Sequence, residues 1–191
     1  MGEKQRILTK KHLQKQFKTK EIKLDLGCGN NKKEGFIGVD VADLGGVDVV
    51  ADFNKKLPFP DNCADEIYSR DCLEHVEKII GLLKEIIRIS KPNTKITFIV
   101  PYYTRFSSMT NLFHYHHFNS KTFDSFFEDY PWNYYSDIRF KLISRRINFF
   151  WFFKPIEWIV NISDKARNIY EILFPYIFPA KEVVFKMEVI K

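Results

Sequence analysis

Two glycines stand directly after a run that predicts a buried strand. Residues 22–26 alternate between apolar and polar, and Gly27 and Gly29 follow, where a missing side chain allows backbone angles and close approaches closed to other residues. A second short strand, residues 36–40, ends in a carboxylate. A glycine turn after one strand and an acid closing the next is the arrangement that holds a nucleoside in a doubly wound sheet. The ligand then lies against the backbone, and the acid accepts hydrogen bonds from ribose hydroxyls.

Further motifs follow in an order that resembles the class I S-adenosylmethionine (SAM)-dependent methyltransferases, in their UbiE-like (methyltransferase type 11) branch. The stretch DLGCG at residues 25–29 resembles the first motif of that family, whose loop holds the methionine part of SAM. LEHV at 73–76 resembles the turn after its fourth strand. KPNT at 91–94 resembles its KPGG turn, with Asn93 and Thr94 replacing both glycines. The likeness runs over residues 21–127 and implies SAM as the cofactor and methyl transfer as the reaction.

The resemblance also assigns roles to individual side chains. Asp40 stands where the family keeps its ribose-binding acid, and Asp52 where an acid meets the adenine amino group. The full cofactor-binding set that the resemblance implies is Asp25, Leu26, Gly27, Cys28, Gly29, Asp40, Val41, Ala51, Asp52, Phe53, Arg70, Asp71 and Glu74.

The connection between the first two strands is too short for an ordinary crossover helix, which with its loops needs roughly 10–12 residues or more. We therefore expect residues 30–34 to form a loop or a single helical turn, and Asn31 replaces the third glycine of the fuller GxGxG pattern. The short connection counts against NAD, whose ribose acid usually lies about 20 residues after the glycine motif. SAM carries no pyrophosphate and so has less need of a helix end that binds anions.

Polar side chains after the fourth and fifth strands would face the methyl group, because ligands of parallel sheets lie beyond the carboxyl ends of the strands. Methyl transfer from a sulfonium needs alignment, exclusion of water and, for a hydroxyl acceptor, removal of a proton. Histidine titrates in the right range for that last task. The predicted catalytic candidates are His75, His114, His117 and Asp71. A purely structural role stays open for each histidine, and no metal is predicted, since no cysteine or acid lies at ligand spacing beside residues 114–117.

The elements that must position these residues alternate between strand and helix. Further strands are predicted at 47–51, 66–70, 95–101, 138–144 and 182–190, with helices at 76–90 and near 122–130. This alternation predicts an α/β, doubly wound, Rossmann-like fold with a mostly parallel sheet. The resemblance adds seven strands in the order 3-2-1-4-5-7-6, the last antiparallel, with a shortened first crossover helix.

Residues 147–181 form an aromatic-rich insertion between the last two predicted strands. Pro155, Pro175 and Pro179 predict two short helices, and the charged residues among the aromatics exclude a membrane span. Four roles stay open: a packed extension, a dimer interface, an interfacial helix, or a lid over a bulky or lipid-linked acceptor.

Composition sets the outer limits. With 191 residues, 45% hydrophobic and 28% charged, the chain is expected to form a globular domain over residues 21–191, preceded by a basic arm at residues 1–20. The three cysteines lack paired or metal-type spacing, and the polar N-terminus lacks a signal-peptide pattern, so a reduced cytoplasmic location is expected. The net charge of +6 keeps contact with nucleic acid open.

The sequence therefore predicts a SAM-dependent methyltransferase that acts on an oxygen or nitrogen of a small molecule, glycan or lipid-linked acceptor. Neither an Asn/Asp-Pro-Pro turn after the fourth strand nor a Pro-Cys nucleophile occurs, which disfavours two classes of base methylation. An RNA methyltransferase using the basic arm and a SAM- or nucleoside-binding protein without catalysis stay open. So do a monomer or homodimer and peripheral contact with a membrane.

Overall fold

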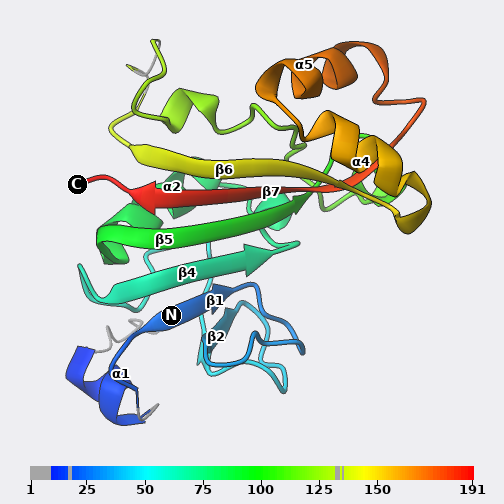
Figure 1. Ribbon diagram of the computed structural model, residues 1–191. Helices are drawn as coiled ribbons and strands as arrows, with labels where there is room; N and C mark the ends of the chain where they lie inside the picture. Colours follow the sequence, from blue (N-terminus) through cyan, green and yellow to red (C-terminus); the bar gives the residue numbers. More distant parts are fainter. Residues whose placement is uncertain (1–9, 17–18, 132–133, 135) are drawn as a thin grey trace.

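A seven-stranded sheet forms the centre of the computed structural model, which describes residues 10–16, 19–131, 134 and 136–191 (Figure 1). The strand order is β3-β2-β1-β4-β5-β7-β6. The five parallel strands are β1 (Lys23–Leu26), β2 (Ile37–Asp40), β3 (Val49–Val50), β4 (Ala64–Arg70) and β5 (Ser90–Pro101). The strand β7 (Ala180–Val189) runs antiparallel to both β5 and β6 (Phe140–Phe149). The predicted fold class and order are confirmed.

The carboxyl ends of β1, β4 and β5 point to the same edge of the sheet (Figure 1). The register pairs Leu26 with both Val39 and Ser69, and Arg70 with Ile99. The loops that begin at residues 27, 41 and 71 therefore meet at one edge, which is where parallel sheets bind their ligands.

The first crossover contains no helix, as the short spacing predicts. Residues 30–34 are turns and irregular backbone, closed by hydrogen bonds from Asn31 N to Cys28 O (3.1 Å) and from Phe36 N to Lys33 O (3.1 Å). The strand β3 is shorter than the predicted 47–51 and lies at the edge of the sheet.

The helix between β4 and β5 is α2 (Ile79–Ile89), and it buries Leu82, Leu83, Ile86 and Ile89. It starts later than the predicted residue 76, because Val76, which follows the 3-10 turn η1 (Leu73–His75), has an extended backbone. After β5, the chain forms the short helix α3 (Phe106–Thr110).

The helix predicted near residues 122–130 is wrong. Only a 3-10 turn, η2 (Asp124–Phe126), forms there. Phe123 and Phe127, four residues apart, are both buried, while Asp124 turns to pair with Arg145 of β6 (2.6 Å). This ion pair and the packing of the aromatic rings fix the chain in a shape that local periodicity does not describe.

Two short helices form the insertion between β6 and β7, as the prolines predict. After a 3-10 turn, η4 (Trp151–Phe153), come α4 (Lys154–Val160) and α5 (Asp164–Leu173), both beyond the end of the sheet where β5 ends (Figure 1). Pro155 lies in the first turn of α4, and the Ser163 hydroxyl caps α5 by accepting a hydrogen bond from Ala166 N (3.1 Å).

Part of the predicted basic arm forms a helix, α1 (Lys10–Gln16), whose Leu13 is fully buried in the main core. Residues 1–9 and 17–18 lie outside the described residues. Within the part of the chain that the structure describes, no helix combines the length and apolar character needed to cross a bilayer.

Candidate cofactor and acceptor site

The turn after β1 is shaped by two glycines in the left-handed region. Gly27 has a φ of 76° and Gly29 a φ of 51°. The Gly27 amide donates a hydrogen bond to Val39 O on β2 (2.8 Å), which holds the turn against the neighbouring strand. A Cβ atom at Gly27 would lie 2.3 Å from the Cβ of Cys72, so no other residue fits here without movement.

Asp40 closes β2 beside this turn. Its Oδ2 accepts a hydrogen bond from the Gly29 amide (2.9 Å), and its Oδ1 accepts one from Ala42 N (3.1 Å). Each carboxylate oxygen has two lone pairs, so both can still accept a bond from a ribose hydroxyl. The backbone bonds fix the orientation of the carboxylate before a ligand arrives.

Two hollows flank the glycine turn, and both are lined by Gly27 and Asp71. The first, of about 240 Å³, is lined by Gly27, Asp40, Val41, Asp52, Phe53, Asn54, Asp71, Cys72, His75 and Val76. The second, of about 450 Å³, is lined by Asp25, Gly27, Cys28, Asn31, Lys33, Tyr68, Arg70 and Asp71. The first holds the acids predicted for ribose and adenine, and the second surrounds the loop predicted for the methionine part. The residues present therefore fit a two-part ligand of the SAM type that lies across the turn.

Asp52 lies on the loop after β3 with its charge stabilised. The hydrogen bond from Asn54 N (2.9 Å) and the ammonium group of Lys55 lower the pKa of the Asp52 carboxyl. The side-chain oxygen of Asn54 accepts a hydrogen bond from Lys78 N (2.8 Å), just before α2. The part of the first hollow that Asp52 and Asn54 line is thus tied to α2.

Four of the predicted cofactor residues line neither hollow. Leu26 and Ala51 are buried in the main core, Gly29 donates its amide hydrogen bond to Asp40, and Glu74 is buried. Cys28 lines the second hollow, and burial, followed by the charge of Asp25, raises the pKa of its thiol to about 11. The Cys28 thiol is therefore uncharged at neutral pH and contributes an uncharged surface to the second hollow.

Lys33 is a residue of the site that the sequence reasoning missed. Its Nζ lies 4.4 Å and 4.3 Å from the ring centroids of Phe36 and Tyr68, and its amide donates to Asp25 Oδ2 (2.8 Å). With Arg70 it lines the second hollow and supplies a cation for an anionic group. A basic residue within the shortened crossover was the signal available in the sequence.

The structure brings the rings of His75 and His114 together, whereas the His117 ring contacts Ser108 on α3. The rings of His75 and His114 meet edge to face, with centroids 4.6 Å apart. His75 Nδ1 lies 3.1 Å from Phe113 O, whereas His117 Nδ1 lies 3.4 Å from the Ser108 hydroxyl on α3. Of these three, His75 is the histidine that lines the first hollow.

Asp71 and Glu74 differ in their environments. Asp71 is exposed, has a φ of 47°, and lies 3.6 Å from Arg105 in an ion pair. Glu74 is only 1% exposed, and burial, with the charge of Asp71 adding to it, raises the pKa of its carboxyl to about 7. Burial, with the nearby His75 adding to it, lowers the pKa of His114.

Comparisons with known proteins agree with this geometry. Residues 30–98 match the family Methyltransf_11, a methyltransferase domain. Cycloartenol-C-24-methyltransferase of Arabidopsis thaliana is 36% identical over 70 residues, which are 35% of this chain and 21% of that protein. The chain thus spans about a fifth of the length of this curated relative.

Solved structures share the fold. A SAM-dependent methyltransferase from Archaeoglobus fulgidus superposes with a TM-score of 0.60 at 18% identity, over 94% of this chain and 92% of that one. One from Mesorhizobium loti gives 0.55 at 14% identity, over 87% and 90%. The family match over residues 30–98 and the shared fold together support a class I S-adenosylmethionine-dependent methyltransferase, with S-adenosylmethionine as its cofactor.

Proposed function

We propose that this protein transfers the methyl group of SAM to an oxygen or nitrogen of an acceptor that carries an apolar chain, such as a lipid-linked glycan. The observation that carries the proposal is an apolar cavity between α4 and α5, whose Tyr170 packs against Tyr102 just after β5, where the acceptor is expected. When bound, SAM supplies a methyl group already activated by the positive charge of its sulfur.

The tasks left to the chain are binding, orientation and removal of a proton. Asp40 holds the ribose, Asp52 and Phe53 face the adenine, and Lys33 and Arg70 attract the carboxylate of the methionine part. His75, at the wall of the first hollow, is placed to accept the acceptor's proton.

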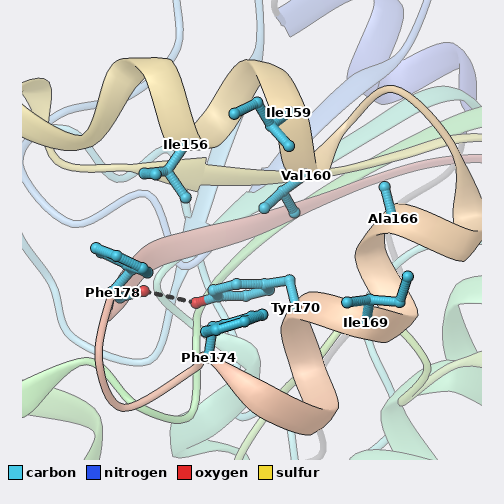
Figure 2. A pocket seen from close by; sticks show the side chains of 8 residues that line it. All are labelled: Ile156, Ile159, Val160, Ala166, Ile169, Tyr170, Phe174 and Phe178. Atoms are coloured by element: carbon cyan, nitrogen blue, oxygen red, sulfur yellow. Dashed lines mark hydrogen bonds between the residues drawn. The ribbon is translucent and has the colours of Figure 1, made fainter.

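The cavity between α4 and α5 has a volume of about 290 Å³ (Figure 2). It is lined by Ile156, Ile159, Val160, Ala166, Ile169, Tyr170, Phe174 and Phe178. The Tyr170 hydroxyl donates to Phe178 O (2.8 Å), so the only side-chain polar group of the lining is satisfied. A cavity with such walls accepts hydrocarbon and offers no hydrogen bond to a sugar or a base.

Aromatic contacts join this cavity to the carboxyl end of β5. Tyr170 lies 6.1 Å, ring to ring, from Tyr102, and Tyr103 lies 6.1 Å from Tyr176. Glu171 accepts hydrogen bonds from the Tyr102 hydroxyl (3.2 Å) and from the amide and hydroxyl of Ser120 (2.8 Å each). The helices are thereby fixed on the side of the sheet where the acceptor is expected.

The outer faces of α4 and α5 are also apolar. Trp158 of α4 is 70% exposed and Ile172 of α5 is 76% exposed. Large exposed apolar side chains on these helices favour an acceptor that is presented from a lipid surface. The match to cycloartenol-C-24-methyltransferase covers only 35% of this chain, so it leaves the acceptor to be tested.

A pair of acceptors with one sugar headgroup, with and without a hydrocarbon chain, tests the proposal. Formation of S-adenosylhomocysteine is measured, and we expect at least a tenfold lower KM for the acceptor that carries the chain. The variant Ala166→Phe, which fills the cavity, should remove this difference. Ile172→Phe on the exposed face of the same helix is the matched control and should keep it.

Equal KM values for both acceptors in the wild type would contradict the proposed acceptor class. SAM binding with no turnover on any acceptor would instead support a binding protein without catalysis. Turnover on copurifying RNA, with binding that weakens steeply as salt rises, would move the acceptor to nucleic acid.

A further inference from the structure

Three potential metal ligands meet beside the first hollow. Glu74 and His75 lie on η1 after β4, and His114 comes from the loop after α3. One donor atom from each lies within 4.8 Å of the other two. The donors of an ion with bonds of 2.0–2.2 Å are about 3.4 Å apart, so small side-chain movements would complete the site.

The backbone holds the two loops in this arrangement. Tyr115 N donates to Glu74 O (2.8 Å), and His116 Nε2 lies 2.9 Å from Val76 O. His75 Nδ1 lies against Phe113 O, which leaves its Nε2 free for a ligand bond. A backbone carbonyl on the second ring nitrogen is the usual support of a metal-binding histidine.

Two polar atoms of the cluster lack a partner. Glu74 is 99% buried, and neither its Oε2 nor His114 Nδ1 has a hydrogen-bond partner among residues 10–16, 19–131, 134 and 136–191. Buried polar atoms are nearly always paired, because an unpaired one costs its full desolvation energy. The cluster therefore lacks a binding partner that would satisfy a carboxylate and an imidazole nitrogen together.

We propose that Glu74, His75 and His114 bind a divalent transition-metal ion, with Zn²⁺ as the first probe. Two imidazole nitrogens and one carboxylate suit Zn²⁺ and its neighbours better than Mg²⁺ or Ca²⁺, which prefer oxygen ligands. The spacing of residues along the chain did not predict a metal site, because no acid lies near residues 114–117 in the sequence. The fold brings Glu74 to His114. Three protein ligands leave a coordination position open, as in catalytic zinc sites.

The binding of the ion stands independently of methyl transfer, whereas a use for it rests on the proposed function. His75 also lines the first hollow, so the open position of the ion is at the boundary with the acceptor. There an ion would orient an acceptor hydroxyl and increase its acidity, a task that His75 performs directly when no ion is bound.

Calorimetric titration of the EDTA-treated, dialysed protein with ZnCl₂, and separately with MgCl₂, tests the site. We expect one Zn²⁺ per chain with a Kd in the micromolar range or tighter, and much weaker binding of Mg²⁺. Glu74→Gln and His114→Ala should each weaken Zn²⁺ binding at least tenfold. Glu77→Gln, which changes an exposed acid three residues further on, is the matched control and should bind Zn²⁺ like the wild type.

If Glu74→Gln or His114→Ala fails to fold, His75→Ala still tests the site, because His75 is exposed and its replacement leaves the core intact. It too should lose at least tenfold in affinity. The proposal is overturned if the folded wild type binds no Zn²⁺, or if all three variants bind it as the wild type does. SAM titration of the same samples reports on the cofactor site separately, so failure of the metal site and failure of the methyltransferase proposal are distinguishable.

Discussion

The backbone at Gly27 lies directly against the side chain of Cys72, with space for a hydrogen but none for a methyl group. Gly27 belongs to the turn after β1, and Cys72 to the loop after β4. Both line the first hollow. The contact therefore sets how closely the two loops approach around the expected cofactor.

Gly27→Ala should be far more damaging than Gly29→Ala. Both positions have a positive φ, which costs about 1–2 kcal/mol for alanine. At Gly27 the new Cβ also meets Cys72 at 2.3 Å, whereas at Gly29 nothing lies within 4 Å. Calorimetry should show at least a tenfold greater loss of SAM affinity for Gly27→Ala. Adding Cys72→Gly should recover part of it, and equal losses at both glycines would refute the steric explanation.

Asp40→Ala should weaken SAM binding roughly 10- to 100-fold, because it removes a charged acceptor of the ribose hydroxyls. It also releases the Gly29 and Ala42 amides that the carboxylate holds. The exposed Asp43 on the same loop provides the control, and Asp43→Ala should bind SAM normally. Unchanged affinity in Asp40→Ala would remove this residue from the ribose site.

His75→Ala should lower turnover about 100-fold at saturating SAM, the usual effect of losing a general base. Its effect on SAM affinity should be small, because the side chain lies at the wall of the hollow. Initial rates and calorimetry on the same preparation separate the two effects. Persistent turnover would make His75 structural and would move the search for a base to His114 and His117.

Glu171→Ala should loosen the helices α4 and α5 from the sheet. It removes the acceptor of three hydrogen bonds from Tyr102 and Ser120, both of which are buried. Limited proteolysis should then cut within residues 150–179 before the rest of the domain. Lys165→Ala, an exposed change on the same helix, should leave the cleavage pattern as it is in the wild type.

Glu85 should make stability depend on acid pH. Burial opposes its charge, but the hydrogen bonds from the Arg88 guanidinium and Leu57 N outweigh this and lower the pKa of the carboxyl. Its contribution is therefore complete above the ordinary value of about 4.3 and is lost as the pH falls through the lowered value.

Urea unfolding of Glu85→Gln and of the wild type measures this contribution. The variant should be about 1–2 kcal/mol less stable at pH 7, and the difference should shrink towards pH 3. A difference that is independent of pH would assign the effect to packing. Asp61→Asn, which changes the exposed second partner of Arg88, should show a smaller effect.

The sequence was most informative where function constrains local chemistry. The turn at Gly27 and Gly29 and the position of Asp40 at the end of a strand were predicted, because both patterns can be recognised from neighbouring residues alone. The missing crossover helix followed from chain length alone. Strand order and the antiparallel β7 came through the family resemblance.

Long-range packing decided what the sequence did not reveal. His75 and His114 lie far apart along the chain, and only the approach of two loops makes their rings touch. The helix expected near 122–130 does not form. Instead, Asp124 forms an ion pair with Arg145, and a contact between segments so far apart in the sequence cannot be read from a local pattern. Lys33 lines the site because its side chain lies over the rings of Phe36, just before β2, and Tyr68 of β4, which are far apart in the sequence.

The pairing of Phe149 with Ala180 means that the segment with α4 and α5 leaves and re-enters the sheet at neighbouring points. Residues 150–179 therefore behave as a cassette, because the closure of their ends is already provided by the β6–β7 ladder. A short turn could replace the cassette, or another sequence could be grafted there, without changing the strand order or the cofactor turn. Under the proposed function, acceptor choice and cofactor binding can then evolve as separate modules of one domain.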